Sequence, residues 1–218
     1  MRRNASRASA FLASLLLASF VALQAPLAHA AGPKIVVLGD SLSAGYGLAP
    51  NEAFPAKLQA ALDAKGVEAE IVGAGVSGDT SAGGLARLDW AVSDDVDAVI
   101  VELGGNDALR GVRPEQTRAN IDAIVTRLQE RGIDVLLAGM LAPPNMGEDY
   151  QQGFDRVFPE IAEKRNVLFY PFFLDGVAAE RDLNLPDGIH PNARGIDVIV
   201  ERILPSVQRL VSKAAAEG

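Results

Sequence analysis

The sequence predicts an α/β fold, namely a single three-layer α/β/α domain with a five-stranded parallel sheet. Short apolar runs rich in valine and isoleucine alternate with longer stretches whose apolar residues recur at helical spacing. The loops between these stretches are short, so each predicted strand is joined to the next by a helix. Parallel strands require such a crossover connection. Both observations indicate a sheet covered by helices on its two faces.

The predicted elements run from Lys34 to near the end of the chain. Strands are predicted over residues 35–38, 69–72, 98–103, 134–138 and 167–170. Helices are predicted over residues 54–65, 82–92, 114–131, 150–164 and 193–211, the last one kinked at Pro205. Residues 141–149, with two prolines and a glycine, are predicted to form a loop.

The start of the chain has the features of a signal peptide over residues 1–30. A basic beginning (Arg2, Arg3 and Arg7) precedes an uncharged apolar run, and Ala28-His29-Ala30 supplies the small-x-small pattern of a cleavage site. A retained membrane anchor is the competing interpretation, but the apolar run is short for a span, which needs about 20 residues. We therefore expect export to the periplasm or the medium and a mature domain over residues 31–218.

Composition narrows the class of protein further. The chain has no cysteine, which excludes a disulfide framework and a thiol nucleophile. Its formal charge of −8 becomes −11 once the three arginines of the signal peptide are removed, which argues against nucleic acid or anionic membranes as partners. A small molecule is the expected partner.

Ser41 stands at the usual position of an active-site residue in such a fold. It follows the first predicted strand in the segment KIVVLGDSLSAGYG, and ligands of open α/β sheets bind beyond the carboxyl ends of the strands. Glycine, aspartate and serine are also ordinary turn residues. The segment alone therefore leaves a turn and a nucleophile open.

His190 is the single imidazole that remains after removal of the signal peptide. A metal site built on several histidines is thereby excluded, and no cofactor is expected. Asp187 lies three residues earlier, a spacing that lets its carboxylate bond the ring Nδ1–H and leave Nε2 free to accept a proton. The competing interpretation makes His190 an ordinary residue and Asp187 a turn or capping residue.

Two further loops could supply hydrogen-bond donors for an oxyanion. Gly78 follows the second strand in VSGDTS, and Asn106 follows the third strand in ELGGND. A glycine N–H and an asparagine amide are suitable donors for a developing negative charge. Each loop alone could be an ordinary turn, but Ser41, Gly78 and Asn106 are all expected beyond the same edge of the sheet.

The blocks GDSLSAGYG, SGDTSAGG, ELGGND and DGIHP resemble, in order and separation, those of the SGNH or GDSL hydrolases. The similarity covers nearly all of the mature chain, and it points to the bacterial exported thioesterase, lysophospholipase and arylesterase branch. Gly73 is one departure, because relatives often have asparagine there. The fold implied is the SGNH-hydrolase, flavodoxin-like one.

The resemblance implies a serine esterase with an acyl-serine intermediate. Ser41 would be the nucleophile, with His190 as base and Asp187 as its orienting acid. The backbone N–H groups of Ser41 and Gly78 and the Asn106 amide would form the oxyanion hole. By analogy, Leu109 and Pro144 would line an acyl pocket. The substrates implied are acyl or aryl esters, with thioesters and lysophospholipids as further candidates.

Two other functions stay open at this point. Gly73-x-Gly75-x-x-Gly78 matches the spacing of a dinucleotide-binding loop after a strand. The negative charge of Asp79, beside the last glycine, would repel a pyrophosphate. The acidic residues that follow stand before the third predicted strand, whereas an acid that binds the ribose of a dinucleotide stands at the end of a strand. A non-catalytic exported binding protein is the second alternative, against which the intact serine, histidine and aspartate argue.

Overall fold

The computed structural model describes residues 32–217. The predicted signal peptide lies outside these residues. Among the described helices, none is long and apolar enough to pass through a bilayer.

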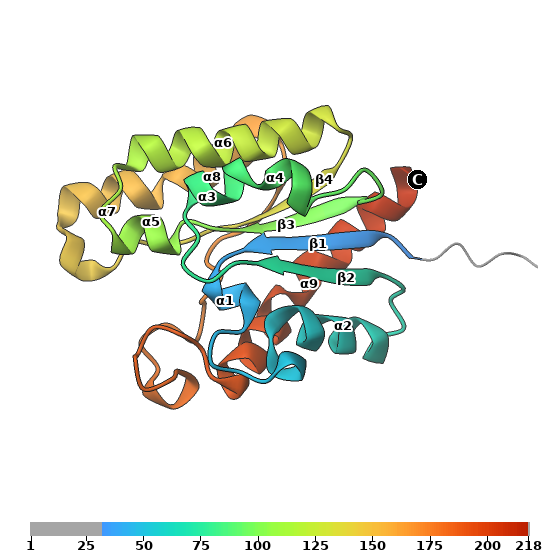
Figure 1. Ribbon diagram of the computed structural model, residues 1–218, viewed down its shortest axis with the longest axis horizontal. Helices are drawn as coiled ribbons and strands as arrows, with labels where there is room; N and C mark the ends of the chain where they lie inside the picture. The colour runs from blue at the N-terminus through green and yellow to red at the C-terminus, as the bar shows by residue number, and fades with distance from the viewer. Residues whose placement is uncertain (1–31, 218) are drawn as a thin grey trace, which may run out of the picture. The chain divides into compact units, whose positions relative to one another are not determined.

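Five parallel strands form one sheet in the order β2-β1-β3-β4-β5 (Figure 1). This order is that of the flavodoxin-like folds, and it confirms the predicted fold class. The three inner strands β1, β3 and β4 are buried on both faces, which explains why their sequences are largely apolar runs. The strands are β1 (Lys34–Gly39), β2 (Glu70–Gly75), β3 (Ala98–Glu102), β4 (Asp134–Ala138) and β5 (Leu168–Tyr170).

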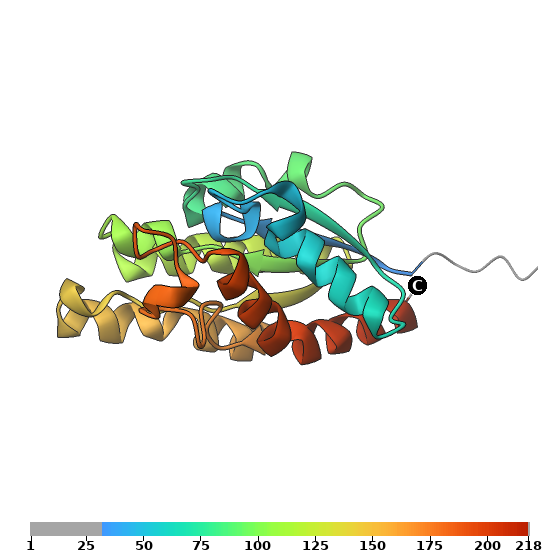
Figure 2. The same ribbon diagram turned by 90° about the horizontal axis from the view of Figure 1, so that it is seen from below.

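Helices cover both faces of the sheet (Figures 1 and 2). One face carries α1 (Ser41–Ala44), α2 (Phe54–Ala64) and α9 (Ala193–Glu217). The other carries α3 (Ser81–Ala86), α4 (Leu88–Ala91), α6 (Pro114–Glu130) and α8 (Val157–Arg165), while α5 (Gly105–Leu109) and α7 (Glu148–Asp155) extend beyond the carboxyl ends of the strands. Short 3₁₀ turns cover Pro50–Glu52, Pro144–Met146 and Arg181–Leu183.

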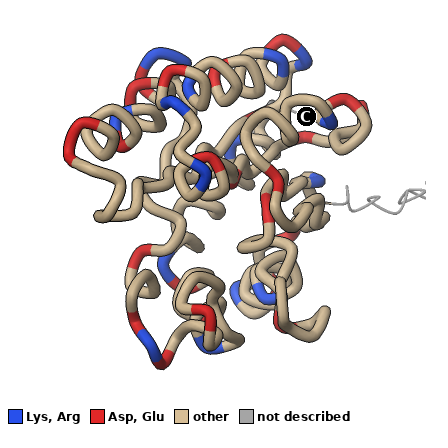
Figure 3. Tube along the Cα trace, turned by 60° about the vertical axis from the view of Figure 1, so that its left-hand side comes forward, with Lys and Arg blue, Asp and Glu red and all other residues tan. Residues whose placement is uncertain are grey.

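The core lies between the sheet and the apolar stripes of the long helices. Phe54, Leu58 and Leu62 of α2 are fully buried on one side, and Ile121 and Ile124 of α6 are fully buried on the other. These residues are three or four positions apart, or a multiple of a turn, and so share one face of each helix. Charged residues of both signs are distributed over the helices without gathering by sign (Figure 3).

Two predicted helices are each divided in the structure. The stretch predicted over residues 82–92 forms α3 and α4, which meet at Arg87, and the stretch over 150–164 forms α7 and α8, which meet at Arg156. Pro159 explains the second division, because it lacks an N–H and its ring clashes with the carbonyl four residues earlier. Arg87 explains the first, because its buried side chain bonds three groups at the sheet edge.

Other differences concern boundaries. Helix α9 continues through Pro205 to Glu217, beyond the predicted end. The predicted loop over residues 141–149 contains a 3₁₀ turn and the first residues of α7, and the short helix α5 was not predicted. The alanines at the end of α9 favour helix, which accounts for its length.

Candidate active site

The turn after β1 presents Ser41 at the carboxyl edge of the sheet. Asp40 caps α1, since its Oδ1 accepts a hydrogen bond of 2.9 Å from the Leu42 N–H. Ser41 is therefore the first residue of a helix, directly after a buried strand. Gly39 is required here, because a Cβ at this position would lie 2.2 Å from Ser43 Oγ and 2.5 Å from a Glu102 carboxylate oxygen.

His190 connects Ser41 to Asp187. Its Nε2 lies 3.0 Å from Ser41 Oγ, and its Nδ1 lies 2.7 Å from Asp187 Oδ2. The backbone N–H groups of His190 and Ile189 donate to Asp187 and lower the pKa of its carboxyl to about 2. An ionised Asp187 only accepts hydrogen bonds, so Nδ1 carries the ring proton and Nε2 accepts from the Ser41 hydroxyl. This arrangement is able to deprotonate Ser41.

Asn106 lies beside Ser41 and lines the same cleft. Its Nδ2 donates a hydrogen bond of 2.9 Å to Asp40 Oδ2. That bond uses one of the two amide hydrogens and leaves the other available. Asp40 thus contacts both the helix that carries Ser41 and the side chain of Asn106.

Gly78 lies in the loop between β2 and α3. Its φ of 83° is in the left-handed region that favours glycine, and its carbonyl accepts a bond of 2.9 Å from Arg110. Within residues 32–217, neither the Ser41 nor the Gly78 backbone N–H donates a hydrogen bond to another group. Gly78 is not among the residues that line the cleft around Ser41 and Asn106, so its oxyanion role stays a prediction.

A buried network ties the Gly78 loop to the Asn106 helix. Asp107, which is 1 % exposed, accepts hydrogen bonds from the backbone N–H and the hydroxyl of Ser81 and from the Thr117 hydroxyl. Sequence reasoning did not find this network, although Asp107 and Ser81 stand within the two blocks that carry the resemblance.

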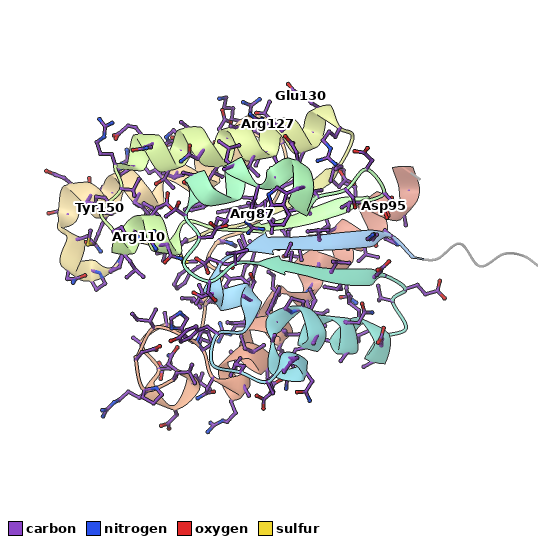
Figure 4. The ribbon with its side chains drawn as sticks, in the orientation of Figure 1. Arg87, Asp95, Arg110, Arg127, Glu130 and Tyr150 are labelled. Carbon is purple, nitrogen blue, oxygen red and sulfur yellow. The ribbon has the colours of Figure 1, made fainter. Side chains whose placement is uncertain are left out.

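Arg87 connects backbone and side-chain groups at the carboxyl edge of the sheet. Its guanidinium donates to Asp79 Oδ2 at 2.6 Å, to the Ala74 carbonyl at 2.7 Å and to the Gly39 carbonyl at 2.8 Å. These three groups come from the Gly78 loop and from the ends of β2 and β1. Figure 4 shows Arg87 between α4 and β1, whereas Arg110 and Tyr150 lie at the far end, near α5 and α7.

Two buried carboxyl groups lie behind the Ser41 turn. Burial, together with the charge of Asp40, raises the pKa of Glu102 well above its usual value. Burial raises the pKa of Asp40 to about 6, against the bonds from Leu42 and Asn106 that favour its charged form. Both carboxyl groups therefore keep their protons to higher pH than an exposed carboxyl group does, and Glu102 is completely buried.

A cleft of about 510 Å³ opens in front of Ser41 and His190. Leu109 and Pro144, the two predicted pocket residues, both line it. Leu141, from the loop that the sequence also suggested for this pocket, lines it as well. Sequence reasoning missed other apolar lining residues, namely Met140 after β4 and Phe172, Leu174, Ala178 and Ile189 from the segment after β5. The cleft therefore suits an apolar group next to the serine.

The glycine spacing of the dinucleotide alternative does not form the loop which that alternative requires. Gly73 and Gly75 lie within β2, and the following α3 has only six residues. Asp79 is paired with Arg87. Among residues 32–217, no three histidine, cysteine, aspartate or glutamate side chains gather so that they could hold a metal ion.

The fold is a flavodoxin-like α/β/α sandwich, and the carboxyl edge of its sheet carries a hydrogen-bonded serine, histidine and aspartate, the side chains of a serine hydrolase. Comparison with known proteins defines the class further: residues 37–198 match the model of the GDSL-like lipase/acylhydrolase family. The chain belongs to this family, as its sequence blocks predicted, and it is a carboxylic ester hydrolase.

The relatives include the esterase TesA of Pseudomonas aeruginosa, which is 38% identical over 91% of this chain and 99% of its own length. The thioesterase 1/protease 1/lysophospholipase L1 of Escherichia coli strain K12 is 36% identical over 84% of this chain and 87% of its own. Among solved structures, the esterase EstA from a Pseudoalteromonas species, inhibited by monoethylphosphonate, has a TM-score of 0.78. It is 33% identical and covers 82% of this chain and 98% of its own.

Proposed function

We propose that this chain is an exported serine esterase that cleaves acyl or aryl esters through an acyl-Ser41 intermediate. The observation that carries the proposal is the continuous hydrogen-bonded series from Ser41 Oγ through His190 to Asp187. Neither the serine nor the histidine needs to move far to exchange a proton at a separation of 3.0 Å.

In the acylation half, Ser41 Oγ attacks the ester carbonyl carbon while its proton moves to His190 Nε2. Asp187 stabilises the resulting imidazolium, because its ionised carboxylate bonds the Nδ1–H. The tetrahedral intermediate then collapses, the alkoxy or aryloxy group departs with the proton from His190, and the acyl group stays on Ser41.

The negative oxygen of the intermediate would accept hydrogen bonds from the free backbone N–H of Ser41 and from the second amide hydrogen of Asn106. Gly78 would supply a third donor from the neighbouring loop. Donors held in place before the reaction stabilise the transition state more than water does, and each is worth about 10²–10³ in rate.

Deacylation repeats these steps with water. His190 takes a proton from the water molecule as its oxygen attacks the acyl carbon, and then returns the proton to Ser41 Oγ as the carboxylic acid leaves. One ester and one water thus give one acid and one alcohol, and the enzyme is restored.

The apolar cleft supports small or medium acyl chains as the group bound beside Ser41, with Leu109 and Pro144 in its wall. Thioesters and lysophospholipids are further candidate substrates, since relatives carry thioesterase and lysophospholipase names. We also propose that residues 1–30 are a signal peptide whose removal delivers the domain of residues 31–218 to the periplasm or medium. An amino terminus at Ala31 in exported protein would support this.

The test is hydrolysis of p-nitrophenyl esters of two to twelve carbons by the mature chain and by Ser41→Ala. We expect turnover by the wild type, a preferred chain length, and loss of turnover in the variant. An acyl-coenzyme A series read by thiol release tests thioesters in parallel. Equal hydrolysis by wild type and Ser41→Ala would contradict the proposal, as would the absence of turnover on every ester.

A further inference from the structure

Tyr46 is held in a tight turn directly after the helix that carries Ser41. Its two neighbours, Gly45 and Gly47, have φ angles of 79° and 74°, in the left-handed region that side chains other than glycine rarely adopt. The Tyr46 N–H donates to the Ser41 carbonyl at 3.2 Å. The backbone of Tyr46 is thereby fixed to the residue that carries the proposed nucleophile.

The same turn packs against the loop that carries His190. A Cβ on Gly47 would lie 2.8 Å from Leu185 Cδ1, so the two loops are in close contact at this point. Leu185 in turn donates its N–H to the His190 carbonyl at 2.7 Å. The turn and the histidine loop, which are more than a hundred residues apart in the chain, thus form one packed unit.

The Tyr46 ring covers a face of the imidazole. The two ring centroids are 4.4 Å apart and the planes are tilted by 33°. Tyr46 is 52 % exposed, and within residues 32–217 its hydroxyl takes part in no hydrogen bond. His190 lines the cleft, whereas Tyr46 does not, so the tyrosine contacts the imidazole from outside the substrate cavity.

We propose that Tyr46 is a positioning residue of the active site, whose ring holds the His190 imidazole in line between Ser41 and Asp187. The inference rests on the proposed function. Asp187 and Ser41 contact only the edges of the imidazole, through its two nitrogens, and these bonds alone allow the ring to rock out of line. An aromatic ring against one face restricts that motion. Its electron-rich face also attracts the imidazolium that forms during each transfer of a proton.

The contact predicts an effect on turnover larger than its effect on folding or on substrate binding. An exposed ring adds little to the core, and the cleft does not include it. Loss of the ring should therefore lower kcat between about threefold and thirtyfold, the range that a ring–cation contact supplies, with KM changed by less than about twofold.

The experiment compares Tyr46→Leu and Tyr46→Phe with the wild type in p-nitrophenyl ester hydrolysis. Phenylalanine keeps the ring and should keep kcat within about twofold, whereas leucine should show the loss. Trp90→Leu is the matched control, because Trp90 is an aromatic residue that is 73 % exposed and does not line the cleft. It should retain wild-type kcat. Thermal unfolding of all four proteins shows whether they are equally folded.

Three results would overturn the inference. They are wild-type kcat in Tyr46→Leu, an equal loss in Tyr46→Phe, which would assign the effect to the hydroxyl, and a change confined to KM. Failure of the proposed function looks different, because the wild type would then hydrolyse no ester or Ser41→Ala would hydrolyse as fast. Active wild type, inactive Ser41→Ala and fully active Tyr46→Leu would reject the positioning role alone.

Discussion

Replacement of Asp40 by asparagine should separate the activity of this enzyme from its stability. Asp40 is 1 % exposed, and its two oxygens accept from the Leu42 N–H and from Asn106 Nδ2, each at 2.9 Å. Asparagine keeps one acceptor but presents an NH₂ group where the second was. Asn106 would then turn its amide to offer its oxygen to that group, so the Asn106 N–H would no longer face an oxyanion.

The loss of one oxyanion donor sets the expected size of the effect on activity. We expect kcat for p-nitrophenyl esters to fall by about 10²–10³ in Asp40→Asn, with KM little changed. Asp89→Asn, at an exposed position in α4, is the matched control and should leave kcat unchanged.

Stability should move in the opposite direction. Burial raises the pKa of Asp40 from 3.8 to about 6, which corresponds to roughly 3 kcal/mol of cost for the ionised form. Since the pKa is raised on folding, this cost is absent below pH 4, grows between pH 4 and 6 and is complete above pH 6. The asparagine variant has no carboxyl group at this position, so it lacks this cost at every pH.

Urea unfolding of the two proteins at pH 4 and pH 8 measures this difference. Relative to wild type, Asp40→Asn should gain up to about 3 kcal/mol between the two pH values. A kcat within about fivefold of wild type would refute the proposed control of Asn106, and a stability difference independent of pH would refute the electrostatic reasoning.

Three other changes test neighbouring parts of the site. Asn106→Ala should lower kcat by about 10²–10³, and near-normal hydrolysis would remove Asn106 from the oxyanion hole. Glu102→Gln removes a buried acid whose pKa is raised by burial. In urea unfolding, the stability of this variant relative to wild type should increase as pH rises above 4.5, by at most about 1.4 kcal/mol per pH unit. A difference that does not change with pH would contradict this. Arg87→Met leaves Asp79 without its partner in a site only 15 % exposed and should cost about 3–5 kcal/mol in the same measurement, whereas a cost below 1 kcal/mol would be too small for a buried ion pair.

The sheet and the main helices could be predicted because local patterns define them. The apolar run of β1 and the stripe of α6 each follow from the spacing of their own residues. The division between α7 and α8 also had a local signal, since Pro159 cannot donate to the carbonyl of Asp155, the last residue of α7, and so cannot continue that helix. The division at Arg87 had none, because its cause is a set of hydrogen bonds to β1, β2 and Asp79.

The candidate site shows the same contrast. Asp187 and His190 are three residues apart, so their contact could be predicted from spacing, and the resemblance paired them with Ser41. The contact of Tyr46 with His190 joins two distant loops, and a half-exposed tyrosine has no sequence mark that distinguishes it from other surface residues. Such contacts depend on how distant loops pack against each other, and this packing cannot be predicted from residue spacing within one segment.

The most direct test of a nucleophilic serine beside a histidine base is a fluorophosphonate probe followed by peptide mass mapping. The mature enzyme should gain one phosphonyl group on Ser41 and lose esterase activity in step with labelling. His190→Ala should label far more slowly. A fully labelled enzyme that still hydrolyses esters, or a probe attached to another residue, would contradict the account.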